Sequence, residues 1–148
     1  MNALRAYLGF LALLVCLPGA APASQLTSAN TGECVNVPWH GYPIDGTRVH
    51  VLQCDSGRQN QQWVLQHGQI VGVGGSCLDV QDGASTDGTA VIFVACNGRP
   101  GQSWSVIDGK IVGIGGKCLD ISGGHAADHA TLIVATCAGT PSQQWTVQ

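Results

Sequence analysis

Carboxyl and amide side chains recur at fixed distances from cysteine and tryptophan. These residues are Asn36, Asp79 and Asp120, each two residues after a cysteine, and Gln61, Gln102 and Gln143, each two residues before a tryptophan. Such groups form paired hydrogen bonds with hydroxyls, and an aromatic ring packs on an apolar C–H face; a pyranose presents both. These residue types are therefore suited to holding a polyhydroxylated ligand by non-covalent contacts.

The same landmarks define a unit of 41 residues that occurs three times. Trp63, Trp104 and Trp145 are 41 residues apart, and residues 67–107 and 108–148 are identical at 18 of 41 aligned positions. Repetition at a fixed period of this length indicates one supersecondary unit copied along the chain. The first unit then covers about residues 26–66.

Catalytic interpretations of these residues find less support. Asp79 and Asp120 could be imagined as the carboxylate pair of a glycoside hydrolase, but they occupy equivalent positions in separate repeats. His125 and His129 have the His-x-x-x-His spacing of a metalloprotease, yet Ala126 stands where glutamate is required. Nothing resembles a nucleophile with a base and an orienting group. We therefore expect no enzyme, no metal site and no cofactor.

Each repeat also contains two cysteines. Six cysteines allow 15 pairings, and the repeat selects the one in which each unit closes its own pair. The expected disulfides are Cys34–Cys54, Cys77–Cys96 and Cys118–Cys137. Zinc is the less favoured alternative because no Cys-x-x-Cys pair occurs, whereas disulfides persist in the oxidising compartments that an exported protein meets.

Short alternating segments predict strands and nothing predicts a helix. In the second repeat they lie at 77–80, at 91–94 and around the Gln-x-Trp motif. A further strand at 111–114 leads into the third repeat. Alternation with β-branched residues is typical of strands. Four short strands per unit and 21 glycines predict an all-β closed architecture of about twelve strands.

Residues 1–23 have the features of a secretory signal peptide. Arg5 precedes ten apolar residues at 8–17, a run too short to span a bilayer, and small residues at 21 and 23 form a cleavage site. We expect one domain over 24–148 that is secreted, or periplasmic in a bacterium. No later segment is hydrophobic enough for a membrane span.

The charge balance argues against one class of partner. After residue 23, five Lys and Arg residues face nine Asp and Glu residues, and the basic residues form no cluster. Nucleic-acid binding needs a basic patch, so we expect no nucleic-acid partner.

Taken together, these motifs resemble the ricin B-type lectin family over all of 24–148. They are Cys-x-Asp/Asn, a second Cys, Gln-x-Trp, and Asp-Gly-Thr, whose third copy keeps Asp128 but has His129 in place of glycine. The resemblance implies a β-trefoil with pseudo-threefold symmetry, tryptophans in the core, and up to three shallow sugar sites. We name these sites α, β and γ in chain order.

The resemblance also implies which residues contact sugar. In that family an acid lies two residues after the first cysteine, and an aromatic plate lies two residues before the second. The β site has Asp79 and Gln102, and the γ site has Asp120 and Gln143. At both plate positions, however, the residue is aliphatic, which leaves these sites incomplete.

The α site departs from the family pattern in another way. It keeps polar His50 and the Asn60-Gln61 pair, but Asn36 replaces the acid and Leu52 the plate. The loop that follows supplies the missing ring, either Trp39 or Tyr42, and the other repeats have no aromatic residue there. We therefore predict the best site in the first repeat.

Two functions from different classes follow from this comparison. The first is a secreted, non-catalytic carbohydrate-binding lectin domain with one weak site in the first repeat. The alternative is a secreted protein-binding or inhibitor trefoil that has lost sugar binding and uses residues 39–42 as its anchor. The incomplete β and γ sites favour the alternative, whereas the acids Asp79 and Asp120 favour the lectin.

Overall fold

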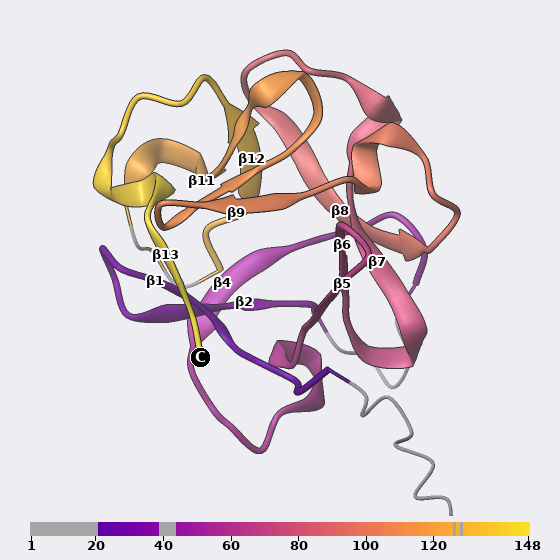
Figure 1. Ribbon diagram of the computed structural model, residues 1–148. Helices are drawn as coiled ribbons and strands as arrows, with labels where there is room; N and C mark the ends of the chain where they lie inside the picture. Colours follow the sequence, from indigo (N-terminus) through magenta and orange to yellow (C-terminus); the bar gives the residue numbers. More distant parts are fainter. Residues whose placement is uncertain (1–20, 39–43, 126, 128) are drawn as a thin grey trace, which may run out of the picture.

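The computed structural model describes residues 21–38, 44–125, 127 and 129–148. Within them the chain forms short strands and three-residue 3-10 helices (Figure 1). The strands are β1 (Leu26–Ser28), β2 (Glu33–Asn36), β3 (Thr47–Arg48), β4 (His50–Gln53), β5 (Val64–Gln66), β6 (Gln69–Val71), β7 (Ser76–Val80), β8 (Thr89–Ala95), β9 (Ser105–Ile107), β10 (Lys110–Val112), β11 (Cys118–Ile121), β12 (Leu132–Ala135) and β13 (Trp145–Val147). The 3-10 helices are η1 (Gln59–Gln61), η2 (Val73–Gly75), η3 (Gln81–Gly83), η4 (Pro100–Gln102), η5 (Ile114–Gly116), η6 (Ser122–Gly124) and η7 (Pro141–Gln143).

Each repeat contributes four strands, and the β-trefoil prediction is confirmed. The first repeat supplies β1, β2, β4 and β5, the second β6 to β9, and the third β10 to β13. In the described part of the chain the strand beyond the expected twelve is β3, a two-residue piece that pairs with β8. One detail differs from expectation: the glutamine of each Gln-x-Trp motif lies in a 3-10 helix, and the strand begins at the tryptophan or one residue after it.

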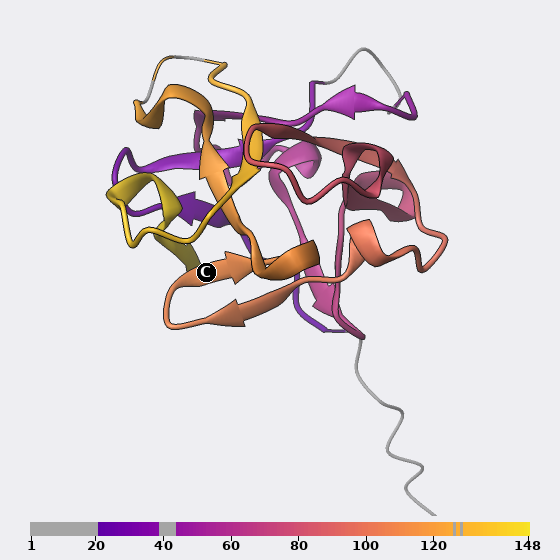
Figure 2. The ribbon, with the colours of Figure 1, turned by 90° about the horizontal axis from the view of Figure 1, so that it is seen from above.

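Hydrogen bonds between repeats close the fold around its threefold axis. Strand β1 pairs with β13, which brings the first and last repeats side by side in Figure 1, and β8 pairs with β12. The third contact joins the first repeat to the second, where β3 pairs with β8 and Val49 N donates to Val91 O at 3.1 Å. In addition, β4 contacts the segment before β12: the N–H of His129 donates to Val51 O at 3.2 Å, and Leu132 N donates to Val49 O at 2.9 Å. In Figure 2 this yellow-orange segment passes beside the purple strands of the first repeat.

The hydrophobic core repeats the sequence symmetry. Its 18 buried residues in the described chain fall into six sets of three, with one member from each repeat. The sets are Leu26, Ile70 and Ile111; Val35, Leu78 and Leu119; Val37, Val80 and Ile121; Val49, Val91 and Leu132; Val51, Phe93 and Val134; and Trp63, Trp104 and Trp145. Every repeat therefore buries the same share of a single core, because no unit can bury its own apolar face alone.

The three tryptophans are held in the core by a repeated hydrogen bond. The indole Nε1–H groups of Trp63, Trp104 and Trp145 donate to the backbone carbonyls of Val35, Leu78 and Leu119, each at 3.0 Å. A buried indole N–H needs such a partner. The prediction that these rings belong to the core is confirmed by their exposures of 1%, 5% and 2%.

The three disulfides lie within the repeats, as predicted: Cys34–Cys54, Cys77–Cys96 and Cys118–Cys137. Each bridge links a cysteine in β2, β7 or β11 to a cysteine in the loop before η1, η4 or η7. The buried glutamine of each repeat hydrogen-bonds to backbone groups on either side of that second cysteine. Among the residues that the structure describes, no helix is long and apolar enough to cross a membrane. The predicted signal sequence up to residue 20 and the predicted plate residues Trp39 and Tyr42 lie outside those residues.

Candidate binding site

A buried glutamine organises the polar cluster at each of the three sites. Gln102 Nε2 donates to Asp79 Oδ2 at 3.1 Å and to the carbonyl of Ala95 at 3.0 Å, and its Oε1 accepts from the N–H of Asn97 at 2.8 Å. Gln61 and Gln143 make the same kind of contacts. The three side chains are at most 1% exposed, so they orient the acid or amide beside them and leave little surface for a ligand.

Equivalent distances show how closely the three clusters agree. The first and third glutamines donate to Asn36 Oδ1 at 3.2 Å and to Asp120 Oδ2 at 2.9 Å. They donate to the backbone carbonyls of Gln53 and Thr136, each one residue before the second cysteine of the repeat, at 3.0 Å in both cases. Each also accepts a backbone N–H at 2.8 Å. The scaffold of the sites is therefore symmetric, and the differences lie in the side chains placed on it.

At the β site the carboxylate of Asp79 forms an ion pair with Arg99. Asp79 is 2% exposed, and its Oδ2 receives a hydrogen bond from Arg99 Nη2 at 2.7 Å. Gly101 stands where the α site has Asn60, and a Cβ at Gly101 would collide with Asp79 Oδ1. A ligand hydroxyl that donates a hydrogen bond to Asp79, as predicted, would therefore have to compete with Arg99.

The γ site keeps a less protected acid. Gln143 holds Asp120 Oδ2, whereas Asp120 Oδ1 is buried and has no hydrogen-bond partner among the described residues. Thr140 takes the place of Arg99, and its hydroxyl lies 3.2 Å from that of Ser142. Hence, among the described residues, no basic side chain hydrogen-bonds to this carboxylate as Arg99 does to Asp79 in the second repeat.

The α site lies in a pocket with a volume of about 460 Å³. Its described lining residues are Asn36, Pro38, His50, Leu52, Arg58, Asn60 and His129. Three of the predicted contacts, Asn36, His50 and Asn60, are thus brought together, with buried Gln61 hydrogen-bonded to Asn36. Pro38 lies in this lining, and the unplaced predicted plate Trp39 follows it in the chain.

A chain of hydrogen bonds defines the protonation state of the α site. Asn60 Nδ2 donates to the carbonyl of Val37 at 2.7 Å and to Asn36 Oδ1 at 3.1 Å. Because the oxygen of Asn36 accepts from Asn60 and Gln61, its Nδ2 is the atom that faces His50 Nε2, at 2.9 Å. An amide N–H can only donate, so His50 Nε2 is the acceptor and the neutral ring carries its proton on Nδ1.

The third repeat adds a residue that the sequence analysis did not assign to the α site. His129 Nδ1 lies 3.3 Å from His50 Nε2, and the two rings pack edge to face with centroids 4.8 Å apart. In the sequence His129 is part of a His-x-x-x-His spacing and stands in place of a turn glycine, and neither feature was connected with the α site. A usable signal was present, since His129 replaces the glycine of the turn found in the other repeats. Arg58, another lining residue, was also not anticipated.

Burial and a neighbouring imidazole weaken the basicity of His50. Desolvation by burial, followed by repulsion from His129, lowers the pKa of His50 from 6.5 to about 4. The unfolded chain therefore takes up this proton near pH 6.5 and the folded protein only near pH 4. Between these values the unfolded state binds more protons, so the contribution of His50 to stability is complete above pH 6.5 and is lost as the pH falls toward 4.

We expect the His50→Ile variant to lose this acid sensitivity. Isoleucine is the residue at this position in the other repeats (Ile92 and Ile133). The measurement is the free energy of unfolding in urea at pH 7.5, 5.5 and 4.5, and the quantity compared is the pH slope of each protein. Asp87 does not disturb this window: its pKa is lowered from 3.8, chiefly by its hydrogen bond from Lys117, so its effect falls at lower pH. Equal slopes in both proteins would contradict the assignment.

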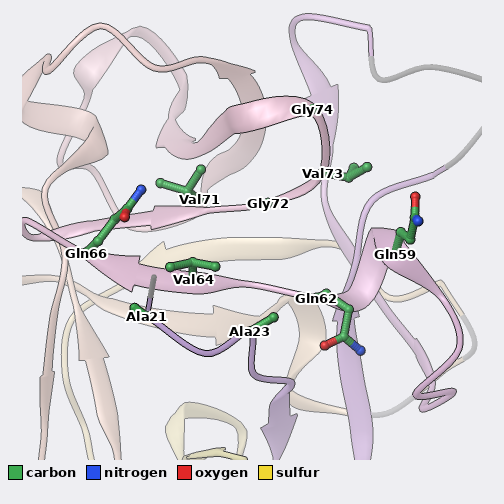
Figure 3. A pocket seen from close by; sticks show the side chains of 10 residues that line it. All are labelled: Ala21, Ala23, Gln59, Gln62, Val64, Gln66, Val71, Gly72, Val73 and Gly74. Atoms are coloured by element: carbon green, nitrogen blue, oxygen red, sulfur yellow. The ribbon is translucent and has the colours of Figure 1, made fainter. Parts of the chain in front are cut away.

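A second pocket, of about 430 Å³, lies beside the N-terminal segment and the β5–β6 hairpin. Figure 3 shows Ala21 and Ala23 beside Val64, with Gln59 and Gln62 at the other end. Its described lining is alanine, valine, glycine and glutamine, and no titratable side chain is among them. Part of its wall precedes Ser24, the predicted start of the processed chain. The α pocket therefore has the stronger claim as a binding site.

Comparison with known proteins agrees with this geometry. The family model of the ricin-type beta-trefoil lectin domain matches residues 22–145. A designed threefold symmetric protein, ThreeFoil, is 30% identical, with a TM-score of 0.76 over 84% of this chain and 96% of its own. The exo-beta-1,3-galactanase 1,3Gal43A from Clostridium thermocellum is 28% identical, with a TM-score of 0.75 over 85% of this chain and 30% of the enzyme.

An earthworm R-type lectin C-half in complex with GalNAc has the same fold at 17% identity, with a TM-score of 0.73 over 86% of this chain and 98% of its own. No curated protein sequence matches the chain.

Proposed function

Because the chain belongs to the ricin-type beta-trefoil lectin family, we propose that it is a secreted carbohydrate-binding protein without catalytic activity of its own. The observation that carries the proposal is the α pocket, in which Asn36, His50 and Asn60 line one space of about 460 Å³. The earthworm relative is described with GalNAc bound, which supports a sugar as the ligand class.

The α pocket offers the two kinds of surface that a pyranose needs. Pro38 and Leu52 supply apolar surface for the C–H face, while His129 and Asn60 supply polar groups at the rim. Trp39 remains the sequence-based proposal for an aromatic plate. Much of the hydrogen-bonding capacity of Asn36 and Asn60 is used within the protein, so we propose a weak single site. A hydrogen bond that merely replaces one to water adds only about 1 kcal/mol.

The β and γ sites are proposed as subsidiary. Ligand binding at β would have to compete with the Arg99–Asp79 ion pair at 2.7 Å. At γ the acid is free of such a cation, but the plate position holds Ala135, and an aliphatic residue of that size cannot stack on a sugar ring. If more than one site is occupied, multivalent glycans gain avidity without any new contact.

We propose that the domain is not catalytic because of the way in which two equivalent acids, Asp79 and Asp120, are hydrogen-bonded. Asp79 is paired with Arg99 and Gln102, and Asp120 lies in another repeat, held by Gln143. A glycoside hydrolase needs its two carboxyl groups on opposite sides of one bond. Among the described residues, the hydrogen-bond partners of the two acids are Arg99 and the glutamines, and none is a second carboxyl group.

The test is a glycan array probed with the oxidised protein comprising residues 24–148. We expect binding that is competed by free monosaccharide and is weakened about tenfold by Asn60→Ala or Trp39→Ala, which corresponds to about 1.4 kcal/mol. Ser103→Ala, at an exposed residue that does not line the α pocket, serves as the control and should leave this binding unchanged. Circular dichroism confirms the fold of each variant.

A blank array from folded protein would overturn the proposal. Binding to a protein that survives excess free sugar would then favour the alternative, a protein-binding or inhibitor trefoil.

A further inference from the structure

Two departures from the repeat meet in the α pocket. His50 stands where the other repeats have Ile92 and Ile133, and His129 stands where they have Gly46 and Gly88. The two histidines come from different repeats and are 79 residues apart in sequence, yet His129 Nδ1 lies 3.3 Å from His50 Nε2. Core packing explains neither residue, since aliphatic side chains and glycine satisfy the same backbone elsewhere.

The backbone at His129 has a conformation that is unfavourable for a residue with a Cβ. Its φ is +68°, in the left-handed region, where the equivalent glycines have φ of +86° and +90°. A residue with a Cβ loses roughly 1 kcal/mol in this region relative to glycine. Such outliers concentrate at functional sites, and this one places an imidazole at the rim of the pocket.

The charge of the pocket is one-sided. Its titratable lining residues are Arg58, His50 and His129, and no carboxylate is among the described lining residues. Asn36 occupies the position that holds an acid in the other repeats. The nearest acid named by a contact is Asp55, whose Oδ2 lies 3.2 Å from Arg58 Nε. This bond uses one of the five N–H donors of the guanidinium, and the terminal Nη groups make no other hydrogen bond within the described part of the chain.

We propose that the α pocket binds an acidic sugar, with the carboxylate or sulfate of the ligand received by Arg58 and His129. The proposal rests on the carbohydrate-binding function proposed above and names the ligand class of that site. Arginine is suited to this task because its planar fork donates two parallel hydrogen bonds to an oxyanion. His50 is held as an acceptor by Asn36 and positions the ring of His129 beside it.

The experiment compares matched sugars by isothermal titration calorimetry or by NMR titration of the processed protein. Glucose, glucuronic acid and glucose 6-sulfate differ in one substituent, and galactose with galacturonic acid forms a second series. We expect the acidic sugars to bind at least tenfold more tightly than their neutral partners. The two acidic arms distinguish a carboxylate from a sulfate as the preferred group.

Three variants separate the pocket from the fold. His129→Gly restores the residue of the other repeats, so it should fold with unchanged or higher Tm but lose the preference for acidic sugars. Arg58→Gln should reduce that preference in the same way. His125→Ala removes an exposed histidine four residues before His129 and should leave binding unchanged.

The possible failures are distinguishable. If neutral sugars bind as well as acidic ones, the acidic-sugar inference falls while the carbohydrate-binding function stands. If acidic sugars are preferred but His129→Gly has no effect, the assignment to this pocket is wrong. If no sugar of either kind binds the folded protein, both proposals fall.

Discussion

Reduction of the three disulfides is expected to unfold the protein at room temperature. Each bridge closes a loop of 19 or 20 residues, which in the chain-entropy model stabilises the folded state by about 3 kcal/mol. The three loops follow one another along the chain without overlap, so their effects add to about 9 kcal/mol. The whole stability of a domain is about 5–15 kcal/mol.

The measurement is near-ultraviolet circular dichroism of the buried tryptophans, together with guanidinium unfolding, with and without a phosphine reductant. The control is a variant that lacks one bridge and keeps the other two, Cys118→Ala with Cys137→Ala. It should lose about 3 kcal/mol of stability and remain folded. If the fully reduced protein keeps its near-ultraviolet spectrum and its unfolding midpoint, the core alone is sufficient and the bridges are dispensable.

The Gln102→Leu variant is expected to lose about 2–3 kcal/mol of stability, mainly because the buried carboxylate of Asp79 loses a donor, a loss of about 1–3 kcal/mol. The carbonyl of Ala95 and the N–H groups of Asn97 and Gly98 also lose their bonds to Gln102, but these residues are exposed and water can replace part of the loss. Leucine has a similar volume, so lost packing contributes little. Asp79 keeps its ion pair with Arg99, which limits the damage.

The matched control for this variant is Ser103→Ala, at the exposed residue between Gln102 and Trp104. A substitution of that kind should change stability by less than about 0.5 kcal/mol. Urea unfolding of the two variants and the wild type gives the comparison. A Gln102→Leu protein within 1 kcal/mol of the wild type would show that water replaces the lost hydrogen bonds and that the glutamine is not a structural clamp.

The three clusters also show why equivalent sequence positions need not be equivalent sites. Asp79 and Asp120 have the same distance from their cysteines and the same glutamine partner. Arg99 nevertheless covers the first, whereas Thr140 stands at the same place in the last repeat. Whether a carboxylate is available therefore depends on a side chain about 20 residues later in the chain, which a motif centred on the cysteine does not include.

The fold could be predicted from the sequence because every repeat carries its own local signals. The 41-residue period, the two cysteines of each unit and the alternating apolar residues determine four strands, one disulfide and six core positions per repeat. A period-2 pattern has only one way to bury its apolar side, and threefold repetition then requires the copies to share one core. This local information accounts for the closed all-β architecture and for all three bridges, whereas the β-trefoil itself was expected from the resemblance to the ricin B-type lectin family.

The binding pocket was decided by the tertiary structure. The sequence by itself indicated Asn36, His50 and Asn60, which lie in one repeat, but His129 reaches the pocket from another repeat through the bonds between the 129–132 segment and β4. Its position also depends on a left-handed backbone conformation that no side-chain pattern encodes. Contacts between distant segments form only when the repeats close around their common axis, and that closure places the His50–His129 pair and Arg58 around a single pocket.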